Sequence, residues 1–538
     1  MALLLSQLPG PVLQAAPAGA SVAQAAPAGP TVTQGSATFA SQGSQLTITT
    51  SDRAFISWQS FNIGPGETTT FVEPSSSSVV WNQINAANPS QILGNLNANG
   101  YVVLQNASGF YLGGEARISV QGLLMTTAPI HVPDLAGGGA WQFNAPPPTA
   151  KIINYGQINL GSGGSAFLIA NTIDNHGTIN APQGQIGLYA GKEVLVSERP
   201  DGRGLSAKVT LPVGSVDNSG KLTADAGAIV LQAQVVNQGG LIQANSVREN
   251  NGVIELFASD SVNLGPDSLI QAQGGSQGAS PGGNVLIKSG GQFSDQSGST
   301  IVVAGGIAGG NAGQAEISAR QMTGLYSQIN AHANAGFLGG KLSIDPENIV
   351  LSNSGDNAPA SGTVNPGDPP SAGSADTLTL NVNSFNTLVS QSGLSQISLQ
   401  ATRDIELSAL WNLPDSQTPG AALSLTAARN ITLDNGSGIS AGKNWSVNLL
   451  AGTELTSPSG RQPGFDGIYL KGNSFVQTLD GNISLRAANE VIVNPGPPYA
   501  NNTGAVGDNG IRTLNGGNIE VTAEYGDVNT GGNFFGYV

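Results

Sequence analysis

The chain has 538 residues, of which only 10% are charged, with 34 acidic side chains against 19 basic ones. Because nucleic-acid binding draws mainly on clustered Lys and Arg, the net charge of −15 excludes nucleic acid as an expected partner. Hydrophobic residues make up 39%, glycine fills 75 positions and cysteine is absent, so we expect a folded, turn-rich protein without disulfides.

Residues 1–30 combine a short apolar core at Leu3–Leu5 with many Ala and Pro residues. Ala23-Gln24-Ala25 has the form of a signal-peptide cleavage site, but the basic region that normally precedes the apolar core is missing. We interpret residues 1–30 as a residual signal peptide with an Ala/Pro-rich tail, and a simple flexible tail is the alternative. No stretch has the roughly 20 apolar residues of a membrane-spanning helix.

Short runs of alternating apolar and polar residues follow along the whole chain, separated by Asn-Gly, Gly-Gly and Asp-Asn turn signals. Helix signals are almost absent. The clearest predicted strands are Gln45–Thr50, Ala150–Leu160, Gln185–Ala190, Ala228–Val236 and Gly252–Ala258.

These runs recur at intervals typical of stacked repeats. Their first apolar residues are Phe167, Ile186, Ile229, Ile254, Val285, Ala315 and Leu342, then Ile397, Leu423, Val447, Ile483 and Ile519. We interpret the long gap between Ile186 and Ile229 as two turns. Short strands with Gly/Asn turns at such periods favour a right-handed parallel β-helix over a β-sandwich or a propeller, whose strand spacings differ.

The segment from about Thr31 to Thr127 resembles the filamentous haemagglutinin N-terminal domain, which is the secretion (TPS) domain of two-partner secretion exoproteins. Ser51–Pro74 resembles the family's strand leading to a Phe-Asn-Ile element, and Asn85–Gly113 resembles its Asn-Pro-Ser-x-Ile-x-Gly-x-Leu segment. The family's Asn-Pro-Asn-Gly turn is altered, because Ala107 and Ser108 replace Pro and Asn. Gly339–Ser352 resembles a recurring element of large adhesins.

The resemblance implies which residues the transporter recognises: Asn62, Asn88, Pro89, Ser90, Asn106 and Gly109. It also implies export from a Gram-negative bacterium, through the periplasm and a dedicated outer-membrane β-barrel transporter of the TpsB type with POTRA domains. The chain is then secreted or held at the cell surface. The opposing reading is that these Asn and Gly residues serve only turns and ladders.

The predicted organisation has five parts. Residues 1–30 precede a secretion domain at 31–150, in which antiparallel strands cap a β-helix. Residues 151–353 continue the β-helix, 354–376 form a Pro/Gly/Ser/Asp linker or loop, and 377–538 add further β-helix repeats. The final repeat lacks a polar cap, so we expect the β-helix to continue beyond residue 538.

Catalytic chemistry finds little support in the residue pattern. His131, His176 and His332 are widely spaced, and no metalloprotease, nucleophile-elbow or phosphate-binding motif occurs. Candidate carboxylates exist only by proximity or inside turns. We list them as Asp225, Glu249, Glu255, Asp434, Asp466, Asp480 and Asp508. We therefore expect no enzyme, no catalytic residue, no cofactor and no bound metal.

The most charged stretch is Gly191–Lys208, which we interpret as a solvated excursion between repeats, with a binding loop as the alternative. The predicted function is that of a secreted adhesin-like exoprotein presenting a rod to an unknown receptor on a host cell, matrix or neighbouring cell. The alternatives are the stalk of a contact-dependent growth-inhibition toxin and, with less support, a β-helix polysaccharide lyase or hydrolase.

Overall fold

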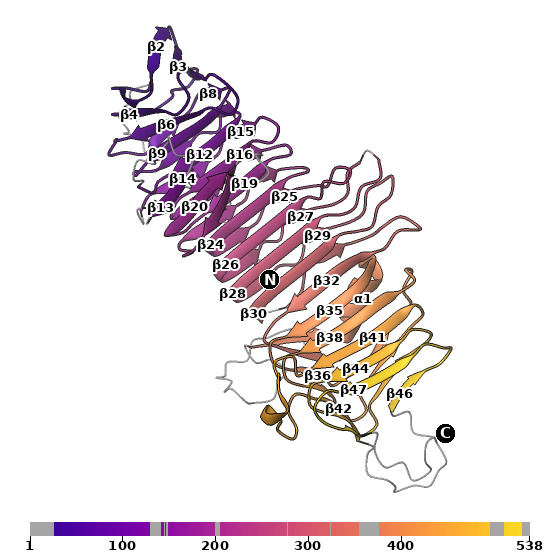
Figure 1. The fold of residues 1–538 in the computed structure, drawn as a ribbon. Helices are drawn as coiled ribbons and strands as arrows, with labels where there is room; N and C mark the ends of the chain where they lie inside the picture. The colour runs from indigo at the N-terminus through magenta and orange to yellow at the C-terminus, as the bar shows by residue number, and fades with distance from the viewer. Residues whose placement is uncertain are drawn as a thin grey trace, which may run out of the picture.

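A computed structural model describes residues 26–129, 141–144, 146, 149–198, 205–276, 278–322, 324–353, 376–494 and 510–529. Figure 1 shows a rod of stacked strands that runs from the N-terminal strands to β47 and β46. The chain coils around the rod axis, and each coil adds a strand to the three long faces described below. The predicted parallel β-helix is confirmed.

The first face is one continuous parallel ladder along the rod. Its strands are β4 (Ala54–Trp58), β6 (Val79–Ile84), β9 (Tyr101–Asn106), β12 (Gly122–Thr126), β16 (Ser165–Ile169), β19 (Gln185–Tyr189), β24 (Ala228–Gln238), β26 (Val253–Leu264), β28 (Asn284–Asp295), β30 (Gln314–Met322), β32 (Gly340–Asp345), β35 (Leu394–Ala401), β38 (Ala421–Ala427), β41 (Trp445–Ala451), β44 (Ile483–Ala487) and β47 (Ile519–Ala523).

The second face bends away from the first and uses the C-terminal halves of β24, β26 and β28. Its separate strands are β7 (Ser90–Ile92), β10 (Phe110–Leu112), β14 (Lys151–Asn154), β17 (Thr172–Asn175), β22 (Ser215–Asn218), β33 (Asn348–Ser352), β34 (Thr377–Asn381), β36 (Ile405–Leu407), β39 (Ile431–Leu433), β42 (Ile468–Lys471), β45 (Val491–Asn494) and β48 (Val528–Asn529).

The third face closes the cross-section in two successive sheets. The first contains β3 (Gln45–Thr50), β5 (Thr68–Val72), β8 (Asn95–Ala98), β11 (Arg117–Val120), β15 (Gln157–Leu160), β18 (Thr178–Asn180), β23 (Lys221–Thr223), β25 (Leu241–Gln243), β27 (Leu269–Gln271), β29 (Thr300–Val302) and β31 (Gln328–Asn330). The second contains β37 (Leu410–Leu413), β40 (Gly438–Ala441), β43 (Phe475–Thr478) and β46 (Gly510–Thr513). A 3-10 turn, η1 (Pro458–Gly460), lies on a loop.

The N-terminal end of the rod carries antiparallel pairs, as the family resemblance implied. β1 (Thr31–Gln34) pairs antiparallel with β4, and β2 (Ala37–Gln42) pairs antiparallel with β3. An edge strand that is paired in this way is protected from association with another chain. These strands therefore cap the first coils.

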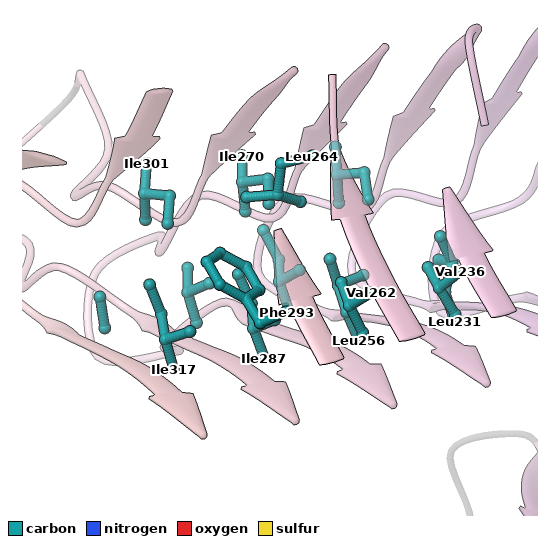
Figure 2. Packing of buried hydrophobic residues seen from close by; sticks show 14 of the residues in the cluster. Leu231, Val236, Leu256, Val262, Leu264, Ile270, Ile287, Phe293, Ile301 and Ile317 are labelled. Atoms are coloured by element: carbon teal, nitrogen blue, oxygen red, sulfur yellow. The ribbon is translucent and has the colours of Figure 1, made fainter. Parts of the chain in front are cut away.

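The recurrent apolar residues predicted from the sequence occupy one inward column on the first face. In consecutive strands, Ile186 is in register with Ile229, and the column continues through Ile254 and Val285 to Ala315 and Leu342. The same column then holds Ile397, Leu423, Val447, Ile483 and Ile519. Figure 2 shows neighbouring side chains of this core, such as Ile287 and Ile317, pointing toward those of the other faces.

Phe167 is the exception to this column, and the prediction was wrong by one residue. Ala166 is the residue in register with Ile186, whereas Phe167 lies opposite Gly187. Successive side chains of a strand point to opposite faces, so a shift of one residue turns Phe167 from the interior to the outside of the β-helix. Its ring is nevertheless fully buried, for the reason given below.

The long gap between Ile186 and Ile229 is also not two turns. β19 pairs directly with β24, so the interval is one coil. The additional residues form β20 (Glu193–Glu198) and β21 (Leu205–Val209), an antiparallel hairpin that leaves the β-helix. Likewise, the single strand predicted over Ala150–Leu160 is two strands, β14 and β15, because the chain turns at Tyr155 and Gly156.

One helix was missed. Helix α1 (Val382–Ser392) lies between β31 and β37, where the third face would otherwise have a strand. The Asn381 side chain accepts hydrogen bonds from the backbone of Asn383 and Ser384, and Gly393 ends the helix in the left-handed region at φ +73°. The buried residues Val382, Phe385 and Val389 line one side, so their helical spacing was the available signal.

Candidate secretion-recognition site

The residues implied in transporter recognition lie on three consecutive coils and are joined by hydrogen bonds. The Asn106 side-chain amide donates to Ser90 Oγ at 2.9 Å and to the Asn88 carbonyl at 3.3 Å. Gly109 accepts at its carbonyl from the Ser90 N–H at 3.0 Å. Asn62 joins from the preceding coil, since its Oδ1 accepts from the Gln91 N–H at 2.8 Å. The structure thus places all but Pro89 in one bonded cluster.

Side-chain hydrogen bonds hold the altered turn at residues 106–109. Asn106 Oδ1 accepts from the Ser108 N–H at 2.9 Å, and Ser108 Oγ donates to the Ala86 carbonyl at 2.8 Å. Gly109 has φ +105°, and a Cβ there would lie 2.5 Å from the Lys151 carbonyl oxygen. Glycine is therefore required at position 109, and the Ser108 side chain contacts the neighbouring coil.

The six residues differ in their exposure to solvent. Asn106 and Ser90 are buried, with exposed fractions of 0% and 1%. Asn88 and Pro89 are exposed, and Asn62 is intermediate. A folded partner could contact Asn88 and Pro89 directly, but it could reach Asn106 only if the turn opened. The roles of all six residues in recognition remain predictions.

Glu73 is a further unusual group near this cluster. It is a buried acidic residue that directly follows β5. Its side chain is 5% exposed, and neither carboxylate oxygen has a hydrogen-bond partner among the described residues. The carboxylate packs against Gly100, where an added Cβ would lie 2.6 Å from Oε2. Burial, followed by repulsion from Asp52, raises the pKa of Glu73 to about 8, and the nearby Gly100 N–H offsets part of that rise. The composition gave no hint of this group.

A second buried cluster lies outside the β-helix, over its N-terminal half. The outward residues Phe55, Trp81, Phe167 and Tyr189 come from strands of the first face. The Trp81 ring stacks on Phe55 at 6.1 Å between centroids. These rings are covered by a three-stranded antiparallel sheet, which we call the cover sheet. It consists of β13 (Trp141–Asn144), β20 and β21.

The cover sheet corrects the interpretation of Gly191–Lys208 as a solvated excursion. Val194, Val196 and Val209 of its hairpin are buried against the aromatic cluster, with Phe143 of β13 beside them. The apolar, β-branched run Val-Leu-Val inside "KEVLVSE" was the signal that could have identified this strand. Residues 199–204, at the centre of the charged stretch, lie outside the described residues.

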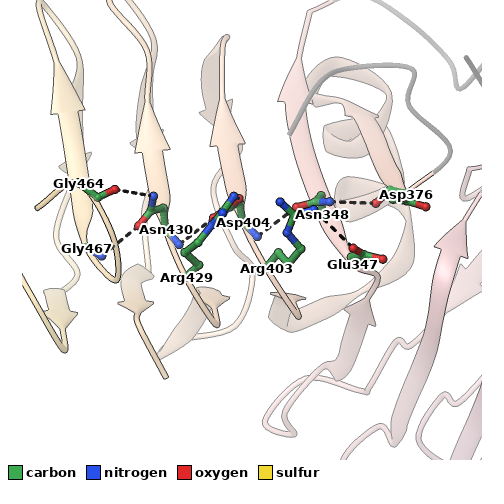
Figure 3. A network of polar contacts seen from close by, with 9 residues as sticks. All are labelled: Glu347, Asn348, Asp376, Arg403, Asp404, Arg429, Asn430, Gly464 and Gly467. Carbon is green, nitrogen blue, oxygen red and sulfur yellow. Dashed lines mark hydrogen bonds and ion pairs between the residues drawn. The ribbon is translucent and has the colours of Figure 1, made fainter. Parts of the chain in front are cut away.

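Side-chain ladders stabilise the turns of the second face. The side-chain amides of this ladder are buried, and each donates to the next coil: Asn154 to Asn175 at 2.8 Å, Asn175 to Asn218 at 2.7 Å and Asn218 to Gln238 at 2.7 Å. In the C-terminal half, Asp404 accepts from Arg429 Nε at 2.8 Å and from the Asn430 N–H at 3.0 Å. Figure 3 shows this network continuing through Glu347, Asn348, Asp376, Arg403, Gly464 and Gly467.

The predicted candidates for chemistry are dispersed. His176 stacks on Tyr155 at 4.7 Å and contacts Ser219 Oγ through Nδ1 at 2.6 Å, His332 contacts Asn330, and His131 lies outside the described residues. Within the described ranges, no group of three or more His, Asp or Glu residues could hold a metal ion.

Two of the candidate acids serve the fold, because Asp225 accepts from Gln243 and the Asn245 N–H, and Asp480 from the Asn444 N–H. Asp508 lies outside the described residues. One carboxylate pair, Glu406 and Asp434, was missed as a pair. Burial and Asp434 raise the pKa of Glu406 to about 7.

Comparison with known proteins finds a family match for the N-terminal half of the chain. A family model of the TPS secretion domain matches residues 23–272. This segment of the chain matches the secretion domain of two-partner secretion exoproteins. The matched segment includes the antiparallel cap, the cluster around Asn106 and the whole cover sheet. The secretion domain expected at 31–150 thus falls inside a longer matched segment, and the β-helix ladder passes residue 150 without a break.

Two similar proteins each match part of the chain. A Heme/hemopexin-binding protein of Haemophilus influenzae is 30% identical over 254 residues, which are 44% of this chain and 28% of that protein. A second protein of that name and organism is 44% identical over 77 residues, 14% of this chain and 8% of its own length. The matches therefore span less than a third of either relative.

The crystal structure of the HMW1 secretion domain from Haemophilus influenzae is similar over 84% of this chain and 98% of that chain, with 20% identity and a TM-score of 0.48. Two-partner secretion exoproteins are exported by Gram-negative bacteria, and the TPS domain implies a cognate outer-membrane transporter of the TpsB type. Within the described residues, no helix is long and apolar enough to cross a membrane.

Proposed function

We propose that this exoprotein is an adhesin of the filamentous haemagglutinin type, held at the cell surface or released, which presents its β-helix rod to a receptor on a host cell, a matrix or a neighbouring cell. The supporting observation is the outward surface of the first face beyond the cover sheet. From β35 to β44 one outward column reads Ser398, Ser424, Asn448 and Ser484, all uncharged and polar.

An uncharged polar surface of this kind can contact a partner without selecting strongly for the partner's charge. Its hydroxyl and amide groups form hydrogen bonds with polar partners such as glycans, and a flat parallel sheet keeps them at a spacing of about 4.8 Å. The core beneath is closed, so the presenting side chains stand on a rigid support. Adhesion then needs no moving part.

Export precedes presentation in this proposal. The POTRA domains of the transporter recognise the secretion domain, with Asn62, Asn88, Pro89, Ser90, Asn106 and Gly109 as the predicted contacts. The chain then folds coil by coil as it emerges, because each coil templates the next. The cover sheet docks only after β21 has emerged, since its strands lie between residues 141 and 209 while its base begins at Phe55.

The export step is tested by fusing residues 1–272 to a reporter and producing it with and without the cognate transporter. Release that requires the transporter and falls at least ~tenfold for Asn88→Ala with Pro89→Ala, at unchanged folding, supports recognition at the exposed pair. Equal release without the transporter contradicts it. Asn159→Ala, an exposed residue of β15, is the matched control.

The adhesion step is tested separately with the full chain. Binding of purified exoprotein to epithelial cells and to a glycan array is compared with the variant Ser424→Asp/Asn448→Asp, which charges the outward column. Loss of binding in this variant, but not in a variant charged at Leu195 on the cover sheet, supports the proposal. Absence of any binding by the wild-type exoprotein rejects adhesion while leaving export intact.

A second candidate function is binding of heme or of hemopexin, which the names of the two relatives suggest. The exposed stack of Tyr111, Tyr155 and His176 favours it, because phenolate and imidazole are the groups that ligate heme iron. A hemin titration followed by absorbance, with Tyr155→Ala/His176→Ala as the variant, tests this. An unchanged Soret band in that variant would reject the site.

We propose, finally, that the exoprotein is not an enzyme. Asp225, Asp404 and Asp480 are engaged by backbone N–H groups, as expected of acids that stabilise turns. Among the described residues, the neighbouring carboxylates Glu406 and Asp434 are an arrangement that favours a polysaccharide hydrolase or lyase. Turnover of a panel of acidic and neutral polysaccharides that disappears in Glu406→Gln would overturn this proposal.

A further inference from the structure

Three neighbouring loops in the middle of the rod connect the third face to the first. They are residues 272–283 after β27, 303–313 after β29 and 331–339 after β31, and we call them the loop ridge. Earlier coils cross the same corner in far fewer residues, such as 181–184 and 224–227. Figure 1 shows the loops that follow β27 and β29 standing out from the rod. The added length is not needed to close a coil, and loops of this kind commonly carry a binding function.

The loop ridge presents three exposed apolar side chains on adjacent loops. Ile307, at 78%, has the highest exposed fraction of the large hydrophobic residues in the described part of the chain, and Leu338 and Phe337 are 51% and 41% exposed. The Phe337 ring lies against Gly309, where an added Cβ would be 2.8 Å from Cε2. It therefore lies beside the turn that carries Ile307. Apolar side chains gathered on adjoining loops indicate an interaction surface, whereas single exposed ones do not.

The backbone around Ile307 has its hydrogen bonds satisfied within the loop ridge. The Gly309 N–H donates to the Gly306 carbonyl at 3.0 Å, and the Gly309 carbonyl accepts from the Ser280 N–H at 2.9 Å. The Ile307 carbonyl accepts from Asn334 Nδ2 at 2.8 Å. Backbone groups that are already paired lose little when water is removed from around them. The turn therefore fits a partner that offers no hydrogen bonds.

The loop ridge also carries no fixed charge. Its three loops contain no Asp, Glu, Lys or Arg, and His332 is their only titratable side chain, whereas the net charge of the chain is −15. An uncharged surface neither attracts nor repels a charged partner strongly. Contact at the ridge must therefore be driven by its apolar side chains.

The small size of the apolar surface favours a lipid partner over a folded protein. A stable protein–protein interface buries about 800 Å² on each partner, which three side chains on loop tips do not provide. The boundary between the headgroups and acyl chains of a bilayer, by contrast, accepts small apolar groups to a depth of about 5–10 Å, whatever their outline.

We propose that the loop ridge binds the surface of a lipid bilayer by inserting Ile307, Phe337 and Leu338, with uncharged phospholipid as its partner. The rod is then held against a membrane at its middle. This inference goes beyond adhesion to a receptor and does not rest on it, because the outward residues of the first face take no part in it.

Flotation of the full chain with phosphatidylcholine vesicles tests the proposal. We expect binding that persists at high salt and weakens at least ~tenfold in Ile307→Ser/Leu338→Ser, at unchanged thermal unfolding. The matched control is Leu195→Ser/Leu450→Ser, which removes two leucines that are 41% and 39% exposed elsewhere on the rod and should bind as the wild type does. No flotation of the wild type, or flotation that requires anionic lipid and is lost at high salt, would overturn the proposal.

The absence of cysteine permits a second test that removes no more than one apolar side chain. Ile307→Cys and Leu450→Cys each provide a single thiol for an environment-sensitive fluorophore. We expect the emission of the label at position 307, but not at position 450, to shift to the blue when vesicles are added. Equal shifts at both positions would reject specific insertion. A shift at position 307 that grows with protein concentration in the absence of vesicles would instead identify a second copy of the chain as the occupant and overturn the proposal.

Discussion

The amide of Asn106 donates to Ser90 Oγ at 2.9 Å, and both residues are buried. This contact ties the turn that follows β9 to the first residue of β7, on the adjacent coil. The neighbours Asn88 and Pro89 are exposed on the same edge. The two halves of the predicted recognition motif therefore have different physical roles, one internal and one facing solvent.

Replacing Asn106 should lower stability before it affects any partner. Asn106→Ala leaves Ser90 Oγ and the Ser108 N–H without this partner, and we expect a loss of about 1–3 kcal/mol in the free energy of unfolding. Asn88→Ala should change it by less than about 0.5 kcal/mol, because the side chain is exposed. Urea unfolding followed by circular dichroism measures both. Equal losses for the two variants would contradict this division.

The amide ladder on the second face should be equally sensitive. In Asn175→Ala, the side chains of Asn154 and Asn218 each lose a buried hydrogen bond. We expect a loss of about 2–4 kcal/mol, since each buried polar group left unpaired costs roughly 1–3 kcal/mol. Asn159→Ala, exposed on β15, serves as the control. Thermal unfolding in which both variants match the wild type would show that the ladder contributes nothing.

A substitution under the cover sheet should stabilise the exoprotein. The Tyr189 hydroxyl is fully buried and has no hydrogen-bond partner among the described residues, and burial raises its pKa. Tyr189→Phe removes this group and should raise the free energy of unfolding by about 1 kcal/mol. Phe167→Ala, in the same cluster, should lower it by about 3–5 kcal/mol. Slower amide exchange in β20 and β21 of Tyr189→Phe would place the gain at the cover sheet.

Stability near the N-terminal cap should fall as pH rises. The folded-state pKa of Glu73 is about 8, above its ordinary value of 4.5, so the protonated form is favoured by folding. Its contribution is complete below pH 4.5 and is lost as pH rises through 8, with a slope of at most about 1.4 kcal/mol per pH unit. Glu73→Gln should flatten this dependence.

Urea unfolding between pH 5 and pH 9 distinguishes the contribution of Glu73 from a general effect of charge. Asp52→Asn keeps the acceptor for the Val79 N–H but removes the neighbouring charge that helps to raise the pKa of Glu73, so the loss of stability should become smaller and end at a lower pH without disappearing. Measuring the wild type and both variants at one ionic strength controls for screening of the charges by salt. Identical pH profiles for wild type and Glu73→Gln would reject the assignment.

Sequence periodicity predicted much of the rod because a β-helix repeats one local requirement. Each coil needs an inward apolar residue at the same place, and Ile229, Val285 and Leu423 satisfy it in sequence and in register. Periodicity failed at Phe167, because the alternation of side chains along a strand does not show which face is covered by another part of the chain. It failed for α1 because polar Asn, Ser and Gln residues masked the helical spacing of Val382, Phe385 and Val389.

What the sequence determined by itself is the parallel β-helix and the family likeness of its first part, because backbone pairing and inward packing are set by residue type and spacing. Only the tertiary structure decided which polar residues are buried. Asn106 and Glu73 are internal while Asn88 is exposed, and the charged stretch after Gly191 folds back as a cover over Trp81. Burial depends on what packs against a side chain from distant parts of the chain, and local sequence does not specify that.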